Sequence, residues 1–258
     1  MPAIFLNHGG GPLPLLGDAA HTNLTRFLSS FSKTVGSPTT ILVASAHWET
    51  DVCTFVGSED PGLLYDYYGF PPASYDIKYP ARNNTELVNK ARELLKGQGF
   101  SSKIDMKRAF DHGVFVPLKL MFPNADIPVV QISLPRSRDP QVAYQMGLAL
   151  KPLRDEGVLI IGSGLSFHNL EAFFSSDRSK LSRSQRFDTG LQEIMGDSID
   201  RQRRLVAWEQ LPEARYCHPA EDHLIPLIFT AGVGDGDACR VDFEDTLMGA
   251  KITGFRFS

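Results

Sequence analysis

Six of the seven histidines in this chain stand where an apolar run ends or in a turn bounded by glycine or proline: His8, His47, His112, His168, His218 and His223. An open α/β sheet binds its ligands outside the carboxyl ends of its strands. Imidazole serves there as a metal ligand or as a proton carrier near neutral pH. We therefore seek the function among these six residues. The remaining histidine, His21, is expected to be a solvated residue near the start of a helix.

Three of these histidines form a candidate metal site. His8 and His47 each end an apolar run, so two parallel strands would present them at the same edge of a sheet. His223 opens an apolar helical segment, and Asp222 or Glu221 beside it could cap that helix or orient the ligand. Three protein ligands with an open position are typical of catalytic metals, whereas structural zinc is normally closed by four.

Two further histidines are candidates for proton transfer. His112 follows Asp111, which could hold the imidazole tautomer, and His168 lies shortly after the run Gly162-Ser163-Gly164. Either histidine could exchange a proton with a substrate hydroxyl. The serine of this run does not lie in a Gly-x-Ser-x-Gly elbow, and the P-loop and dinucleotide-binding patterns are absent. A serine hydrolase and a nucleotide-binding enzyme are therefore disfavoured.

The elements that must position these residues alternate along the chain. Short β-rich runs predict strands over residues 3–7, 40–46, 127–134 and 158–162, and apolar residues at helical spacing predict helices over 23–35, 85–95, 141–153 and 184–195. This rhythm predicts one α/β domain spanning residues 1–258, with a central, mostly parallel or mixed sheet flanked by helices. The alternating segment 251–257 is expected to close the sheet at an edge.

The segment 62–80 departs from this alternation because it is rich in tyrosine and proline. We expect an ordered loop there. Long loops with their own aromatic packing are often lids or binding loops, and an aromatic flap that simply closes over the core is an equally good reading. Both alternatives stay open at the level of sequence.

Composition limits the partners. A net charge of -4 without a block of basic residues disfavours nucleic acid and acidic membranes, and no apolar run is long enough to span a bilayer. The cysteines Cys53, Cys217 and Cys239 form no recognisable motif and are expected to be ordinary thiols in a reducing compartment. We expect a soluble, cytoplasmic protein that acts on a small molecule. The sequence leaves the oligomeric state open.

Seven segments, in chain order, resemble the class III extradiol ring-cleavage dioxygenases, and most closely the branch of the 4,5-DOPA dioxygenases. They are His8-Gly9, Ser-Ala-His-Trp-Glu-Thr at 45–50, Tyr-Gly-Phe-Pro at 68–71, Asp-His-Gly-Val-Phe-Val-Pro-Leu at 111–118, 123–133, Gly-Ser-Gly at 162–164 with His-Asn-Leu at 168–170, and His218-Pro219 with His-Leu-Ile-Pro-Leu at 223–227. The resemblance covers nearly the whole chain.

This resemblance implies an enzyme that inserts both atoms of O2 into a catechol ring, next to rather than between its two hydroxyls. It implies His8, His47 and His223 as ligands of one divalent ion, Zn(II) or Fe(II), with His168 as the acid/base and His112 on the substrate side. His218, Tyr68 and Ser163 lie in matching segments and are weaker candidates for substrate binding.

Two departures from the family pattern bear on the chemistry. Much of the class has a carboxylate as third ligand, where this chain has His223, and three neutral histidines suit zinc as well as iron. The Gly-Ser-Pro that often follows the first histidine is replaced by Gly9-Gly10-Gly11-Pro12. The sequence thus leaves a zinc hydrolase and a non-catalytic metal-binding protein as alternatives, although the second has no need of two proton carriers beside the metal.

Overall fold

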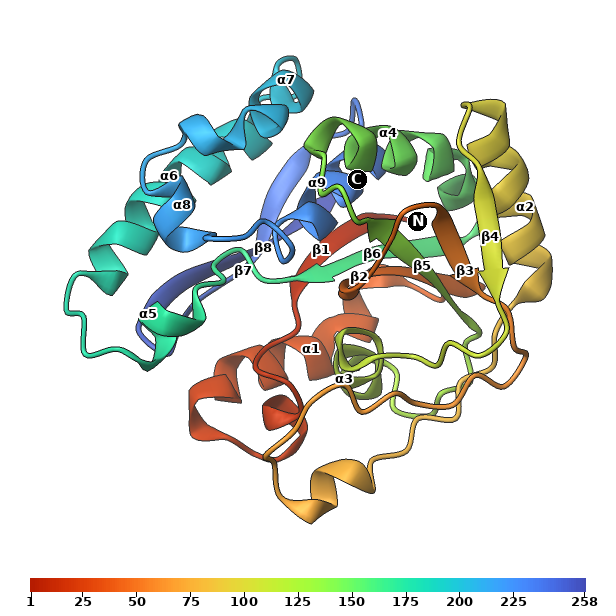
Figure 1. The fold of residues 1–258 in the computed structure, drawn as a ribbon, viewed down its shortest axis with the longest axis horizontal. Coiled ribbons are helices and arrows are strands. Elements are labelled where there is room, and N and C mark those ends of the chain that lie inside the picture. The colour runs from red at the N-terminus through yellow and green to blue at the C-terminus, as the bar shows by residue number, and fades with distance from the viewer.

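The apolar runs predicted as strands form the centre of one sheet in the computed structural model, which describes residues 1–258. The sheet has eight strands in the order β4-β3-β5-β2-β6-β1-β8-β7. In chain order these are β1 (Ala3–Asn7), β2 (Thr40–Thr50), β3 (Cys53–Val56), β4 (Ser102–Asp105), β5 (Val129–Pro135), β6 (Val158–Gly164), β7 (Cys239–Leu247) and β8 (Ala250–Phe257). The central strands read as near-continuous apolar runs because helices cover both of their faces (Figure 1).

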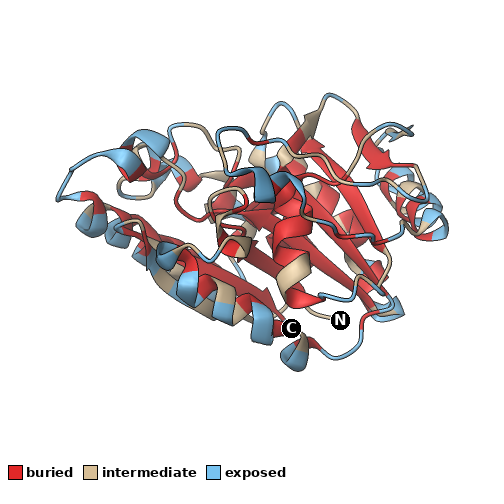
Figure 2. Ribbon diagram, turned by 90° about the horizontal axis from the view of Figure 1, so that it is seen from below, coloured by how far each residue is buried: buried red, intermediate tan, exposed pale blue.

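Helices form the two outer layers. They are α1 (Thr22–Val35), α2 (Thr85–Gly97), α3 (His112–Met121), α4 (Pro140–Leu150), α5 (Leu170–Phe174), α6 (Lys180–Gly196), α7 (Arg201–Val206), α8 (Ala214–Cys217) and α9 (Ile225–Val233). The apolar faces of α1 and α3 share one core, and those of α2, α4, α6 and α9 share the other. Figure 2 shows the buried sheet between helices whose outer faces are exposed. The predicted α/β class with a mixed sheet is confirmed.

Parallel pairing brings three strand ends to one edge. β1 and β2 both pair in parallel with β6, so the end of β1 at His8, the far part of β2 and the end of β6 at Gly164 lie close together. In β2 the pairing with β5 shifts register between Ala44 and Glu49, which is the segment that contains His47. A bulge of this kind re-aims a side chain. The predicted strand 40–46 therefore extends through His47 to Thr50.

Two glycines of β6 let the third ligand segment approach the sheet. A Cβ on Gly162 would lie 2.1 Å from Thr230 Oγ1, and a Cβ on Gly164 would lie 2.3 Å from the carbonyl oxygen of His223. The backbone of Leu165 also donates a hydrogen bond to that carbonyl (3.1 Å). Any larger residue at these positions would push the His223 segment and the start of α9 away from the strand ends.

Three expectations about elements were wrong or incomplete. The C-terminal strand β8 lies inside the sheet, because β7 pairs with it and forms the edge; β7 carries the charges of an exposed strand rather than an apolar run. Strands β3 and β4 are only four residues long and gave no clear signal. The predicted helix 141–153 is divided into α4 and a 3-10 turn at Lys151–Glu156, since Pro152 follows the end of α4.

The remaining general expectations concern membranes and thiols. None of the helices has both the length and the apolar character that a bilayer crossing requires. The three cysteines are free thiols.

Candidate metal centre and its acid/base residues

The fold gathers five histidines from five separate segments into one cluster. The ring centroids of His8, His47 and His223 form a nearly equilateral triangle with sides of 4.9, 5.3 and 5.0 Å. The ring of His112 lies 3.8 Å from that of His47, and the ring of His168 stacks on that of His223 at 3.5 Å. This cluster occupies the edge at which the strand ends meet.

The hydrogen bonds of His8 define which of its nitrogens is available. Its Nδ1 lies 3.1 Å from Ser163 Oγ, and that hydroxyl donates its only hydrogen to the carbonyl oxygen of Gly113. His8 Nδ1 must therefore carry a hydrogen and donate it to Ser163. The Nε2 of His8 is left with a free lone pair that faces the cluster.

The same hydrogen-bond pattern recurs at His223, whereas His47 makes only a longer contact with a carboxylate, beyond hydrogen-bond distance. His223 Nδ1 donates to the carboxylate of Asp222 (3.0 Å), and His47 Nδ1 lies 3.7 Å from the carboxylate of Asp66. An oxygen partner at one ring nitrogen of a histidine fixes the tautomer in which the other nitrogen can bind a metal. Of the two expectations for the carboxylates beside His223, the contact with the ring is made by Asp222, and neither carboxylate caps α9, which has no side-chain cap.

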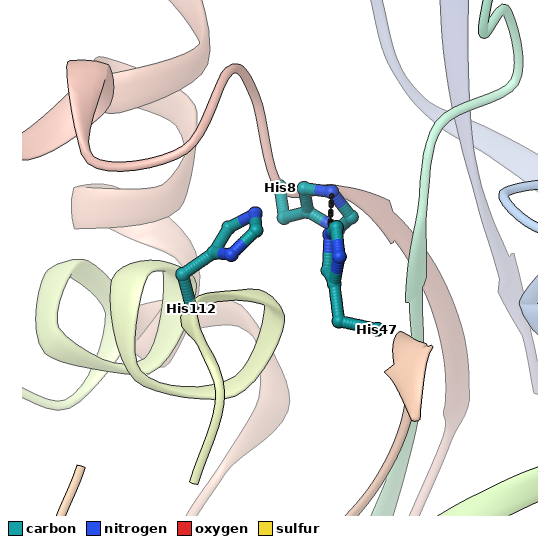
Figure 3. Close-up of side chains that lie close together, drawn as sticks. All are labelled: His8, His47 and His112. Carbon is teal, nitrogen blue, oxygen red and sulfur yellow. Dashed lines mark hydrogen bonds between the residues drawn. The ribbon is translucent and has the colours of Figure 1, made fainter. Parts of the chain in front are cut away.

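A divalent ion fits the donor set. The Nε2 atoms of His8 and His47 lie 3.2 Å apart (Figure 3). Imidazole nitrogens at about 2.1 Å from a tetrahedral zinc ion are about 3.4 Å apart, and their rings are about 5 Å apart. The nitrogen spacing and the triangle of ring centroids both agree with these values.

Burial keeps the candidate ligands neutral. It lowers the pKa of His8 and of His223 well below the ordinary value, and neighbouring imidazoles add to the effect in both cases. Burial, together with the nearby His112, lowers the pKa of His47 to about 4. A metal ion binds the neutral form of imidazole, so these rings are in the ligand form at neutral pH.

Two groupings other than His8, His47 and His223 have donor atoms close enough together to share an ion. Nitrogen atoms of His8, His47 and His112 lie within 4.8 Å of one another, and so do donor atoms of His168, Asp222 and His223. Figure 3 shows the His112 ring entering from α3 beside the other two rings. His112 is therefore placed either to contact a substrate or to approach the ion itself.

Asp66 is a functional candidate that sequence reasoning missed. It accepts hydrogen bonds from both the backbone N–H (3.0 Å) and the Nδ1 (2.8 Å) of His112. Burial would raise the pKa of this carboxyl, but the hydrogen bond from His112 and the nearby imidazoles lower it to about 2. The only signal in the sequence is an acidic residue among the tyrosines of the 62–80 loop. The expectation that Asp111 holds His112 was wrong, because Asp111 bonds Ser45, Arg108 and Gln131 instead.

His168 is the most accessible proton carrier in the cluster. Its Nδ1 lies 3.6 Å from Asp222 Oδ1, and 17% of its side chain is exposed. Burial would raise the pKa of Asp222, but its interactions with His168 and His223 hold it well below the ordinary value. One carboxylate thus lies beside both of the stacked rings.

The three weaker candidates for substrate binding lie in different surroundings. Ser163 is fully buried behind His8, where its hydroxyl already bonds His8 and Gly113. Tyr68 is 92% exposed. His218 is buried next to the rings of Phe187 and Trp208, and its Nε2 donates to the carbonyl of Ser166 (2.9 Å) while its Nδ1 has no partner. Their contact with a substrate stays a prediction.

His21 is buried, contrary to expectation. Its Nδ1 bonds Asp18 (2.7 Å) and its Nε2 accepts the backbone N–H of Gly10 (3.0 Å). Gly9 has a positive φ of 81°, and a Cβ there would lie 2.9 Å from the His21 ring. His21 therefore supports the glycine turn that follows the candidate ligand His8.

The aromatic loop forms as predicted and packs beside the site. Tyr67 contacts Tyr65, Phe70 and Tyr75, and its ring lies 5.8 Å from that of His112. The Tyr67 hydroxyl donates to the carbonyl of Ser74 (2.6 Å), which ties the loop to itself. Its role as a lid stays a prediction.

Comparisons with known proteins agree over nearly the whole chain. A family model described as the catalytic LigB subunit of aromatic ring-opening dioxygenase matches residues 4–255. The chain is 38% identical over 270 residues to dioxygenase tasH of Hapsidospora irregularis, which covers 97% of this chain and 83% of that protein. It is 37% identical over 232 residues to the 4,5-DOPA dioxygenase extradiol of Beta vulgaris, which covers 88% of this chain and 85% of that protein.

Two matches from Escherichia coli extend the comparison. The 4,5-DOPA dioxygenase extradiol of Escherichia coli is 33% identical over 254 residues, which covers 97% of this chain and 92% of that protein. The crystal structure of an uncharacterised Escherichia coli protein superposes with a TM-score of 0.82 at 30% identity and covers all of both chains. At these identities the likeness extends beyond the fold.

Proposed function

The chain belongs to the LigB family of aromatic ring-opening dioxygenases, and from this premise we propose that its substrate is DOPA or a closely related catecholic acid. It is an extradiol dioxygenase, an enzyme that opens a catechol ring with O2. A plant relative and a bacterial relative are both named for 4,5-DOPA, which supports this substrate class. The observation that supports metal-dependent chemistry and proton transfer is the cluster of five imidazoles at one sheet edge.

His8, His47 and His223 would hold one divalent ion, Fe(II) for the reaction with O2 or Zn(II) as an alternative occupant. The nearly equal ring separations of 4.9, 5.3 and 5.0 Å support this set over one that includes His112. The ion supplies Lewis acidity towards a catechol and, as Fe(II), redox chemistry towards O2. Three protein ligands leave positions open for substrates.

His168 removes a proton from a catechol hydroxyl and returns it as the ring opens. Its ring is partly exposed, stacks on that of His223 and has the Asp222 carboxylate 3.6 Å from its Nδ1, which places the ring to exchange a proton with a bound hydroxyl. His112, held by Asp66, donates or accepts a hydrogen bond at its free nitrogen on the substrate side. The aromatic loop beside His112 excludes water.

The test is anaerobic reconstitution of metal-stripped protein with Fe(II) and, separately, with Zn(II). O2 consumption and product absorbance are then followed with DOPA, with catecholic acids of shorter side chain and with catechol itself. We expect O2 uptake only with Fe(II), a yellow ring-opened product, and the highest kcat/KM for DOPA or a near relative.

Other outcomes would redirect the proposal. Equal kcat/KM for catechol and DOPA would show that the acidic side chain is not recognised, which overturns the substrate class while leaving the family chemistry intact. Firm Zn(II) binding without O2 uptake on any catechol would instead favour a zinc hydrolase, the alternative that the three neutral histidines left open.

A further inference from the structure

The backbone of His47 is held by side chains and not by strand pairing. His47 lies in the bulged part of β2 and has no paired residue in either neighbouring strand. Its N–H donates to Ser45 Oγ (3.2 Å), and its carbonyl oxygen accepts from Arg108 Nη2 (3.1 Å). The direction of the His47 side chain therefore depends on where these two groups are fixed.

Both groups are fixed on the carboxylate of Asp111. Ser45 Oγ donates to Asp111 Oδ1 (2.7 Å), and Arg108 Nη2 donates to Asp111 Oδ2 (2.8 Å), which Gln131 also bonds. Asp111 has no exposed surface, and Arg108 is only 17% exposed. In such surroundings a charge-assisted hydrogen bond is short and directional, and removing one partner leaves the other buried without compensation.

The same turn of chain also reaches the first candidate ligand. The carbonyl of Gly113, two residues after Asp111, accepts the Ser163 hydrogen bond that fixes the tautomer of His8. A Cβ on Gly113 would lie 2.3 Å from Ser45 Oγ and 3.1 Å from His47 Cδ2. Only glycine allows this approach of α3 to β2. We call the three residues Asp111, His112 and Gly113 the α3 turn. Asp111 connects to His47, the ring of His112 lies in the cluster itself, and Gly113 connects to His8 through Ser163.

We propose that Asp111 is a positioning residue for the metal centre, acting on His47 through Ser45 and Arg108. The proposal rests on the proposed function, because it takes His8 and His47 as ligands. It explains why a fully buried carboxylate lies next to His112 without bonding that ring. Asp111 itself contacts neither substrate nor ion. Its role is to set the angle at which the His47 Nε2 meets the ion.

The test measures metal binding and coordination geometry rather than turnover alone. Ser45→Ala and Asp111→Asn are prepared in the full-length protein and stripped of metal. Zn(II) affinity is measured by competition with a chromophoric chelator, and the visible spectrum of the Co(II) form reports ligand geometry. Changes in groups that orient metal ligands typically cost about 10- to 100-fold in affinity. We expect a loss in this range for both variants, together with an altered Co(II) spectrum.

Asp242→Asn is the matched control. Asp242 is 11% exposed and pairs with Arg256, which is 5% exposed, at the strand pair β7 and β8, remote from the histidines. This variant loses a comparably buried ion pair and is expected to be destabilised while its Zn(II) affinity and Co(II) spectrum match the wild type. A general loss of stability would not reproduce the pattern expected for Asp111→Asn.

Each result decides the matter. Wild-type affinity and spectrum in Ser45→Ala and Asp111→Asn, with binding lost in His47→Ala, would overturn the role of Asp111 and leave the ligand set standing. Wild-type binding in His47→Ala would overturn the ligand set and the role of Asp111 with it. If Asp111→Asn does not fold, Ser45→Ala decides alone, since it replaces one small buried group by another.

Discussion

At the scale of single residues, the tautomer of three of the clustered histidines follows from the oxygen that faces their Nδ1. Ser163 faces His8, Asp222 faces His223 and Asp66 faces His112. Only Asp222 is a neighbour in sequence; Ser163 lies 155 residues from His8, and Asp66 lies 46 residues from His112. Side chains so remote in sequence leave no local pattern, which is why Asp111 was expected at the place that Asp66 occupies.

His47→Ala and His168→Ala are expected to separate metal binding from proton transfer. His47→Ala removes a nitrogen that lies 3.2 Å from that of His8, so metal should be lost with activity. His168→Ala should keep the metal and the catechol and lose about 100- to 10,000-fold in kcat, the usual share of general acid/base catalysis. Metal content per protein and kcat under Fe(II) saturation check both.

A near wild-type kcat in His168→Ala would remove the assignment of this histidine as the base. His112→Ala would then be the next variant to measure, since His112 is the other candidate proton carrier and Asp66 orients its ring.

At the scale of elements, apolar strands were the most predictable part of the fold. The strand 3–7 was predicted with the bounds that the structure has, because a short apolar run followed by a glycine turn marks both the strand and its end. Helix α3 was missed as an element, since it is apolar on all sides, contains Pro117 and is almost wholly buried. It nevertheless carries His112 and the α3 turn. The spacing of apolar residues identifies helices with one solvent-exposed face, and it gives little signal for a helix such as α3 that is buried on all sides.

The contact between α4 and α9 depends on two glycines. A Cβ on Gly232 would lie 2.0 Å from the carbonyl oxygen of Tyr144, and one on Gly147 would lie 2.0 Å from that of Phe229. Because backbone atoms would clash, the helices must separate. We expect Gly232→Ala to lower the free energy of unfolding by about 3 kcal/mol. Urea unfolding followed by circular dichroism measures this change.

Gly97→Ala provides the control for that substitution. Gly97 also lies in a helix, α2, but a Cβ there would have open space around it. Helix propensity then predicts an increase in stability of up to about 1 kcal/mol. If Gly232→Ala were as stable as Gly97→Ala, the close approach of the two helices would be wrong. That approach also bears on the position of His223, which lies two residues before the start of α9.

At the scale of the whole molecule, the site is a product of topology. Its histidines come from the end of β1, the bulge of β2, the start of α3, the loop after β6 and the loop before α9, and only the parallel pairing of β1, β2 and β6 brings those points together. The sequence could predict that strand ends share an edge. It could not predict the bulge at His47, because a shift of register is determined by the neighbouring strand and by Asp111.

Gathering so many buried imidazoles makes the metal-free protein sensitive to acid. Burial lowers the pKa of His218 and that of His47 to about 4, and those of His8 and His223 also lie well below the ordinary value. An unfolded chain protonates histidine near pH 6.5, so from about pH 6.5 down to about pH 4 the unfolded state binds more protons. The free energy of unfolding therefore falls as the pH falls through this window.

His218 isolates one part of this effect, because it is buried next to Phe187 and Trp208 rather than in the metal cluster. Its contribution is about 1.4 kcal/mol per pH unit and about 3 kcal/mol over the window. His218→Gln keeps a donor for the Ser166 carbonyl but cannot titrate. The free energy of unfolding is measured with urea on both metal-free proteins from about pH 7 to about pH 4.5. It should depend on pH less steeply in the variant than in the wild type, by about 1.4 kcal/mol per pH unit. Parallel curves would mean that folding does not lower the pKa of His218, so that at acidic pH the folded protein would have to accommodate its positive charge next to two aromatic rings.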